Sequence, residues 1–249
     1  MFKRSQNMLE IKNITFEADG SRKILDDISL TIPDGKLICL TGPNGGGKTT
    51  LAKVMAGVLT QTSGQILLNG QDISSLDPTE RAKAGVAFAF QQPVRFKGIS
   101  IRKLLSLAAG RALTDEELKA ALENVGMVAE QYMDRQVDTH LSGGEIKRIE
   151  IASVLLRDAK VAIFDEPEAG IDLWSFNNLI RVFEEIRDSR KCSLVIISHQ
   201  ERILSIADEI ITIQNGKLGL SGTRDSIFPR LICKNDCTDR GICRMEAAQ

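Results

Sequence analysis

The spacing of hydrophobic and polar residues changes several times along the chain. The two kinds alternate at the start of 9–41 and the run becomes continuously apolar at its end, which predicts two or three strands, the last buried on both faces. Helical spacing follows over 48–59. Residues 65–73 then read as a hairpin with an Asn-Gly turn, and 85–91 read as a strand that ends in glutamine.

The middle of the chain, 99–140, has a different character. Its apolar residues fall only at helical spacing, and Thr114 with Glu117 forms a candidate capping box, so we predict an insert of about three helices. The alternation of strands and helices then returns, and the segment after Gly222 reads as irregular. These elements predict an α/β fold with a mostly parallel sheet and a second, helical lobe. The predicted division is a core over 1–98 and 141–222, a helical subdomain over 99–140, and a cysteine-containing tail over 223–249.

Composition narrows the function classes. A chain of 249 residues can form one large domain or two closely joined lobes. Charged residues make up 26% and the net charge is −1, so we expect no electrostatic binding of nucleic acid. The sequence contains no run of 18 apolar residues and no apolar signal core at its start, which predicts a cytoplasmic protein that does not insert into a membrane.

The segment GPNGGGKT, from Gly42 to Thr49, fits the phosphate-loop pattern in full. Its glycines let backbone N–H groups surround a phosphate, Lys48 places a cation on the β- and γ-phosphates of ATP, and the Thr49 hydroxyl can ligate Mg²⁺. A chance match is the alternative, but this segment follows an apolar strand and opens a helix, as the chemistry requires. The predicted nucleotide-binding residues of the loop are Gly42, Asn44, Gly45, Gly46, Gly47, Lys48, Thr49 and Thr50.

Polar side chains also end three other apolar strands. Asp165 and Glu166 close VAIF, and we predict that the first holds Mg²⁺, directly or through water, while the second orients or deprotonates the attacking water. An acidic helix start after a core strand is the alternative. His199 ends SLVIIS and could bond to the γ-phosphate. An amide after GVAFAF could touch Mg²⁺ and the water, and spacing alone leaves Gln91 and Gln92 open.

The segment LSGGE, at 141–145, would alone read as an ordinary loop before a helix, although Ser142 with two glycines also suits an anion. In order, GPNGGGKT, FQQP, LSGGE, VAIFDE, EAGID and SHQ resemble the ATP-binding cassette (ABC) ATPases over about 9–222. The resemblance implies an ABC-type nucleotide-binding domain with a mixed RecA-like core, an antiparallel β lobe and a helical insert. It also implies ATP hydrolysis in a transient, ATP-dependent head-to-tail homodimer, in which each ATP touches Ser142, Gly143 and Gly144 of the second copy.

The resemblance assigns further roles. It aligns Gln91 rather than Gln92 with the catalytic glutamine, and Asp172 with the D-loop aspartate, although EPEAGIDLWS departs from the family's commonest form. Phe16 falls where many cassettes stack an aromatic side chain on adenine, and the alternative is a strand residue packed in the core. Lys147 could hold Glu166 away from water until a partner binds.

Three segments, AFQQPVRFKGIS, SGGEIKRIEI and SHQERIL, resemble the SufC subfamily, the soluble ATPases of the SUF iron–sulfur assembly system. That resemblance implies a SufB/SufD-like scaffold protein as partner. The alternative is the nucleotide-binding subunit of an ABC membrane transporter, whose partner is a separate permease. A cassette that binds without hydrolysing is disfavoured because the catalytic side chains are all present.

Three cysteines crowd the end of the chain as Cys233-x₃-Cys237-x₅-Cys243. Three thiolates could supply three ligands to an Fe–S cluster or to zinc. Their spacing matches none of the standard patterns and a fourth ligand is missing from the segment. The alternative is a tail whose thiols bind no metal.

Overall fold

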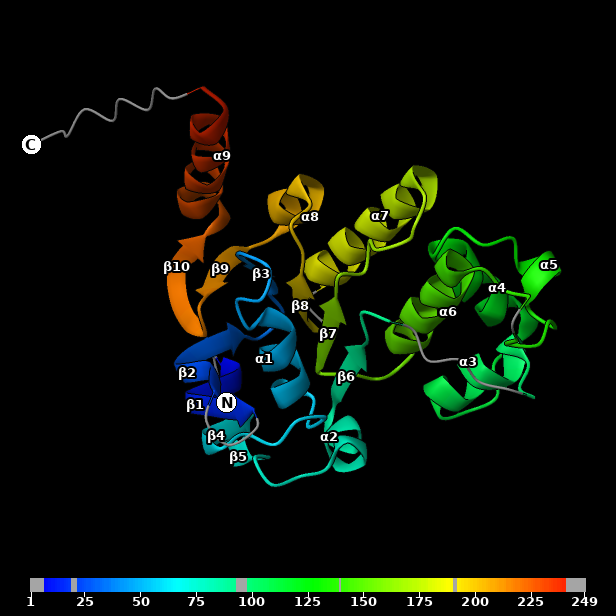
Figure 1. Ribbon diagram of the computed structural model, residues 1–249. Coiled ribbons are helices and arrows are strands. Elements are labelled where there is room, and N and C mark those ends of the chain that lie inside the picture. The colour runs from blue at the N-terminus through cyan, green and yellow to red at the C-terminus, as the bar shows by residue number, and fades with distance from the viewer. Residues whose placement is uncertain (1–6, 19–21, 93–97, 139, 190–191, 241–249) are drawn as a thin grey trace, which may run out of the picture.

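The computed structural model describes residues 7–18, 22–92, 98–138, 140–189 and 192–240, with side chains described from 8 to 232. Its centre is a six-stranded sheet in the order β10-β9-β3-β8-β7-β6 (Figure 1). All pairs in this sheet are parallel except β9 with β10. The strands are β3 (Leu37–Thr41), β6 (Val86–Ala89), β7 (Val161–Asp165), β8 (Ser193–Ile197), β9 (Glu209–Gln214) and β10 (Lys217–Thr223).

The continuously apolar strands are buried on both faces, as predicted. Every residue of β3, β7 and β8 is buried. Because side chains alternate across a strand, neighbours enter different cores: Ile38 and Leu40 join one cluster, and Leu37 and Cys39 join the other. The central sheet therefore separates two hydrophobic cores.

An antiparallel sheet covers one side of the molecule, in the order β2-β1-β4-β5 (Figure 1). Its strands are β1 (Asn7–Ala18), β2 (Arg22–Pro33), β4 (Ser63–Leu68) and β5 (Gln71–Asp72). The predicted hairpin is present, since Leu68 pairs with Gln71 and both turn residues, Asn69 and Gly70, have positive φ (51° and 79°).

The helices follow the remaining periodic segments. They are α1 (Lys48–Met55), α2 (Pro78–Ala84), α3 (Ile101–Ala109), α4 (Asp115–Asn124), α5 (Ala129–Tyr132), α6 (Gly143–Leu155), α7 (Leu173–Ser189), α8 (Glu201–Ile206) and α9 (Arg224–Arg240). Helix α1 ends four residues earlier than predicted, where Gly57 takes a positive φ of 76°. No helix among the described residues is long and apolar enough to cross a membrane.

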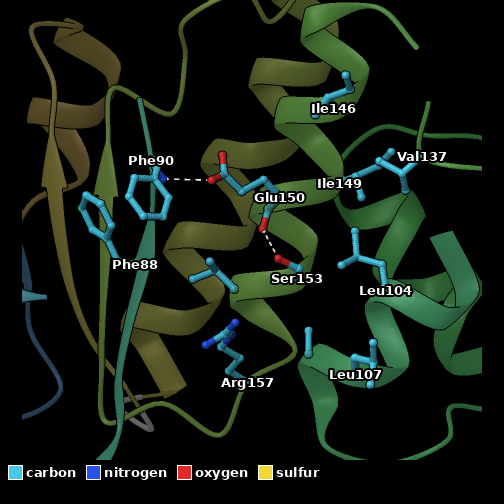
Figure 2. Close-up of a pocket in the computed structure, with 12 residues that line it drawn as sticks. Phe88, Phe90, Leu104, Leu107, Val137, Ile146, Ile149, Glu150, Ser153 and Arg157 are labelled. Atoms are coloured by element: carbon cyan, nitrogen blue, oxygen red, sulfur yellow. Dashed lines mark hydrogen bonds between the residues drawn. The ribbon is translucent and has the colours of Figure 1, made fainter. Parts of the chain in front are cut away.

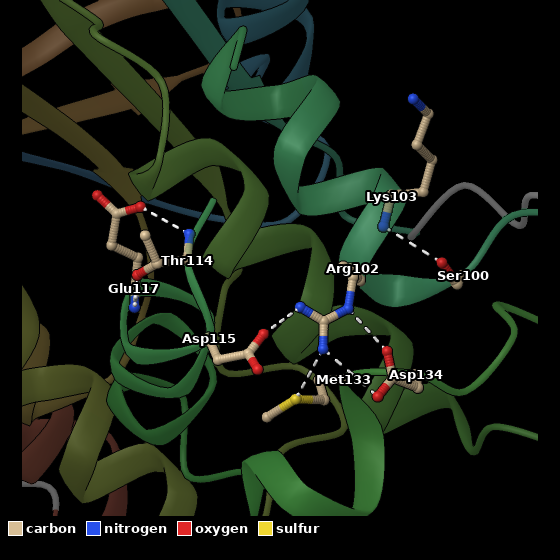
Figure 3. A network of polar contacts seen from close by, with 8 residues as sticks. All are labelled: Ser100, Arg102, Lys103, Thr114, Asp115, Glu117, Met133 and Asp134. Carbon is tan, nitrogen blue, oxygen red and sulfur yellow. Dashed lines mark hydrogen bonds and ion pairs between the residues drawn. The ribbon is translucent and has the colours of Figure 1, made fainter. Parts of the chain in front are cut away.

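Helices α3, α4, α5 and α6 lie together on the right of Figure 1. The predicted capping box of Thr114 and Glu117 opens α4. Arg102 links α3 to the segment after α5 and to α4, because its guanidinium donates to Asp134, at 2.7 Å, and to Asp115 (Figure 3). The first of these bonds, then the second, raises the pKa of Arg102 above its ordinary value.

The prediction of an irregular segment after Gly222 is wrong for residues 224–240, which form α9. The segment is polar and contains Pro229, so its sequence has a low preference for helix. Packing overrides that preference, because Ile227 is only 3% exposed and Phe228 and Leu231 pack against the same core. The helix belongs to the folded domain.

Removing the buried part of the Ile227 side chain tests this attachment. We expect Ile227→Ala to lower the free energy of unfolding by about 2–4 kcal/mol, because it leaves a cavity under α9. The exposed neighbour Arg230 is the control, and Arg230→Ala should change it by less than about 0.5 kcal/mol. Equal, small effects of both changes in urea unfolding would contradict the docking of α9.

Candidate nucleotide-binding site

The loop from Gly42 to Gly47 joins β3 to α1 and lies against β9. Gly42 has a φ of 128°, and a Cβ at this position would come within 2.3 Å of the Ile213 carbonyl oxygen. A Cβ on Gly46 would come within 2.7 Å of the same oxygen. Close packing on β9 therefore requires glycine here, in addition to any need for room around a phosphate.

Lys48 lies across this loop. Its Nζ donates to the carbonyl oxygens of Gly42, at 2.7 Å, and Pro43, at 2.9 Å, and the residue is only 5% exposed. Burial lowers the pKa of Lys48, and the carboxylates of Glu166 and Asp165 oppose that shift. The loop's own carbonyls thus hold a cation where the sequence predicts the β- and γ-phosphates.

Thr49 and Asp165 meet beside the loop. The Thr49 hydroxyl donates to Asp165 Oδ1 at 3.1 Å, while the buried Oδ2 has no hydrogen-bond partner among the described residues. Burial raises the pKa of Asp165, and the bond from Thr49 opposes that rise. A hydroxyl and a carboxylate oxygen without a partner are the hard ligands that Mg²⁺ prefers, so the residues fit this ion.

Gln91 reaches the second carboxylate. Its Nε2 donates to Glu166 Oε2 at 2.6 Å, and Glu166 itself has a positive φ of 48° while its N–H bonds to the Ile197 carbonyl at 3.0 Å. Gln91 lines the same cleft as the phosphate loop, and Gln92 does not. The structure therefore places Gln91, and not Gln92, beside the loop.

A cleft of about 520 Å³ brings the predicted residues together. It opens above the phosphate loop, and residues that follow the carboxyl ends of β3, β6 and β7 contribute to it together with two residues of β2. The lining residues are Arg22, Ile24, Asn44, Gly45, Gly46, Gly47, Lys48, Thr49, Thr50, Gln91 and Glu166. Phe16 is not among them, since it lies opposite Leu25 in the antiparallel sheet and is half-buried against the core.

His199 follows β8 at the same edge of the sheet. Its Nδ1 lies 3.4 Å from the Thr41 hydroxyl oxygen. Partial burial first, and then the charge of Lys48, lower its pKa. Sequence reasoning missed the neighbour that fixes this loop: Glu168 Oε1 accepts from the Ser198 hydroxyl at 2.5 Å. One sign of this contact is visible in the sequence, where Glu168 is the third acidic residue of the segment DEPE.

The signature residues do not line this cleft. Ser142 caps α6, where it and Glu145 form a reciprocal capping box. Gly144 packs so closely on the next loop that a Cβ would come within 2.5 Å of the Gly170 carbonyl oxygen. Asp172 caps α7 through Ser175 N–H, at 3.0 Å, and lies 3.5 Å from Arg148. Ser142, Gly143, Gly144 and Asp172 thus form a second cluster on helix starts.

Two further sequence expectations concern cysteines and Lys147. Cys233 and Cys237 fall in α9, within the part whose side chains are not described, and Cys243 lies outside the described residues. Among the residues that are described, no group of three or more His, Cys, Asp or Glu could hold a metal ion. Lys147 Nζ meets Glu150, at 3.7 Å, while Glu166 accepts from Gln91 instead.

Together, the fold and the cleft define a nucleotide-binding domain that hydrolyses ATP. A profile of the family described as ABC transporter matches residues 25–169, and the chain belongs to this family of ATPases. An uncharacterized ABC transporter ATP-binding protein of Methanocaldococcus jannaschii is 39% identical over 211 residues, or 82% of this chain and 84% of that protein. The probable ATP-dependent transporter ycf16 of Pyropia yezoensis is 35% identical over 234 residues, or 88% and 92%.

Solved structures share the fold. An ATP-bound bacterial exporter of the Atm1 family matches 99% of this chain with a TM-score of 0.81 at 22% identity, and this chain spans 44% of the exporter's length. A dimeric ATP-binding cassette bound to ADP and Pi matches 87% of this chain and 99% of its own, with a TM-score of 0.78 at 19% identity. The predicted fold class, an ABC nucleotide-binding domain, is confirmed.

Proposed function

We propose that this ATPase drives a soluble iron–sulfur assembly scaffold, with a SufB/SufD-like protein as its partner in the cytoplasm. The support is the SufC-like character of the segments around Gln91, Lys147 and His199. Relatives named as probable ATP-dependent transporters, at 35% and 33% identity, match along most of their length, which fits a cassette that works on a separate protein. ATP supplies the free energy, and the partner converts it into work.

The observation that carries a partner-driven function is an apolar groove of about 220 Å³ between β6, α3 and α6 (Figure 2). Phe88 and Phe90 line one wall and Leu104 and Ile149 line the other. Leu107 at its rim is 59% exposed. Phe90 precedes Gln91 in the chain, so a protein seated in this groove would contact the segment that leads to the cleft.

Within this function, we assign the core over 1–98 and 141–222 to catalysis and the helical subdomain over 99–140 to the partner. In the core, Lys48 would hold the β- and γ-phosphates and Asp165 with Thr49 and Gln91 would hold Mg²⁺, which supplies charge neutralisation when bound. Glu166 would orient the attacking water. His199 would bond to the γ-phosphate.

The second copy supplies the remaining contacts in this proposal. ABC ATPases form ATP-dependent dimers. In a head-to-tail pair, Ser142, Gly143 and Gly144 of one chain would cover the γ-phosphate held by the other, with Asp172 between the two sites and Phe16 on the adenine side. The exposed start of α6 supports this, since no atom lies within 4 Å of a Cβ built on Gly143.

Glu166→Gln tests the catalytic assignment. We expect this variant to keep ATP binding and to lose most of its turnover, because an amide cannot accept the proton of the attacking water. ATP should then remain bound and hold two chains together, which size-exclusion chromatography with Mg-ATP measures. A monomer at all ATP concentrations together with persistent turnover would refute both the role of Glu166 and the dimer.

Isolation of the chain with its bound partner tests whether that partner is a soluble scaffold protein. We expect tagged protein from its native source to carry a soluble scaffold protein, identified by mass spectrometry. Leu107→Asp should remove that partner because it places a charge in the apolar groove. The control is Val58→Asp, which changes an exposed apolar residue outside the groove and should keep the partner.

A polytopic membrane protein in the same experiment would instead identify a transporter subunit. That alternative has its own support, since a sulfate/thiosulfate import ATP-binding protein of Synechocystis is 32% identical over 212 residues. It matches 84% of this chain and 59% of that protein.

The three cysteines at the end of the chain enter this proposal as metal ligands. If the chain itself binds iron or zinc, then Cys233, Cys237 and Cys243 are the thiolates that the sequence offers. Anaerobic reconstitution with iron and sulfide, and separately with zinc, should then yield bound metal that is lost in the triple Cys→Ser variant. If the unaltered chain shows no cluster absorbance and binds no zinc, this role is excluded.

A further inference from the structure

Lys147 is a buried lysine in the second turn of α6. Its side chain is 1% exposed, and its Nζ donates to the Phe90 carbonyl oxygen and lies 3.3 Å from the Gln91 carbonyl oxygen and 3.5 Å from that of Asp165. One ammonium group thus gathers the backbone at the ends of two neighbouring strands, β6 and β7.

Glu150, one turn later on α6, completes the arrangement. Its Oε1 accepts from the Phe90 N–H at 3.0 Å, as Figure 2 shows, and its Oε2 lies 3.7 Å from Lys147 Nζ. Both backbone groups of Phe90 are therefore held by a pair of opposite charges on one face of a helix. We call Lys147 and Glu150 the α6 bracket.

The α6 bracket holds the residue that comes immediately before Gln91. Gln91 leaves this anchored backbone and donates to Glu166 at 2.6 Å. Glu166 in turn directly follows Asp165, whose carbonyl the same lysine approaches. The bracket therefore fixes both ends of the Gln91–Glu166 contact relative to each other.

We propose that Lys147 and Glu150 are positioning residues, which set the reach of the Gln91 side chain into the ATP cleft. They touch neither the cleft nor Glu166 among the described contacts, so they act through the backbone of Phe90 and Gln91. This step rests on the proposed role of Gln91 at Mg²⁺ and the attacking water. It does not depend on which protein occupies the groove.

The hydration free energy that is lost when these two charges are buried argues for a positional role. Burial lowers the pKa of Lys147 and raises that of Glu150, so each charge is held against desolvation. An apolar pair of similar volume would fill the same space without that penalty. What an apolar pair could not do is hold the Phe90 N–H and carbonyl group in fixed directions, because these groups need an acceptor and a donor.

A double-mutant cycle separates positioning from a general structural effect. We expect Lys147→Met to lower kcat about tenfold while KM for ATP changes less than about twofold, since the phosphate loop is untouched. Gln91→Ala should lower kcat by at least as much. In the Gln91→Ala background, Lys147→Met should then lower kcat by less than about twofold, because there is no side chain left to position.

The controls use variants of the same kind. Lys119→Met removes an exposed lysine of α4 that pairs with Glu123 of the same helix and with Glu130 of α5, and it should leave kcat unchanged. Glu150→Gln, which keeps an acceptor for the Phe90 N–H, should give the same pattern as Lys147→Met with a smaller fall in kcat. It also serves if Lys147→Met does not fold, as thermal melting of each variant will show.

Three results would overturn the proposal. Unchanged kcat in Lys147→Met shows that the bracket does not matter for turnover. An equal fall in kcat with and without the Gln91 side chain shows a structural role only. An unchanged kcat in the single variant Gln91→Ala shows that the Gln91 side chain does not contribute to turnover, so its position would not matter. Failure of the scaffold proposal would appear in the isolated partner and would leave these kcat ratios as they are.

Discussion

The register of three fully buried parallel strands determines where the chemistry of this protein can lie. Ile197 of β8 is level with Leu40 of β3 and with Asp165 of β7, so all three strands end at one edge of the sheet. The phosphate loop follows β3, Asp165 is the last residue of β7 with Glu166 next to it, and His199 comes two residues after β8. A shift of one residue in any strand would turn its apolar side chains into the wrong core and would also move its polar residue away from this edge of the sheet.

The strand ends are also tied to each other behind the cleft. Lys147 joins the backbone after β6 to the end of β7, and Glu168 joins the segment after β7 to Ser198 after β8. Both links use a buried charged or acidic group, and burial raises the pKa of Glu168 as it does that of Glu150. The ends of β6 and β7, and those of β7 and β8, therefore move together or must break a hydrogen bond within the protein.

Sequence reasoning succeeded where function and structure are encoded in neighbouring residues. Apolar runs predicted the buried strands, and polar residues at their ends predicted which side chains would meet. It failed at α9, whose burial depends on Ile227 reaching a core built by distant segments. It also missed the α6 bracket, because the partners of Lys147 are backbone carbonyls and no residue type marks them in a sequence. The start of helix α2 is readable in the sequence, because Asp77 and Glu80 form a capping box there.

The cleft and the start of α6 are separate places on a single chain. Lys48 is satisfied by the carbonyl oxygens of its own loop, and the cleft above it is lined by β2, the phosphate loop, the start of α1, Gln91 and Glu166. The start of α6 carries the positive end of a helix, and Ser142 there is exposed and lines no part of that cleft. In the proposed head-to-tail pair, the exposed start of α6 of the second copy would cover the terminal phosphate that the cleft holds.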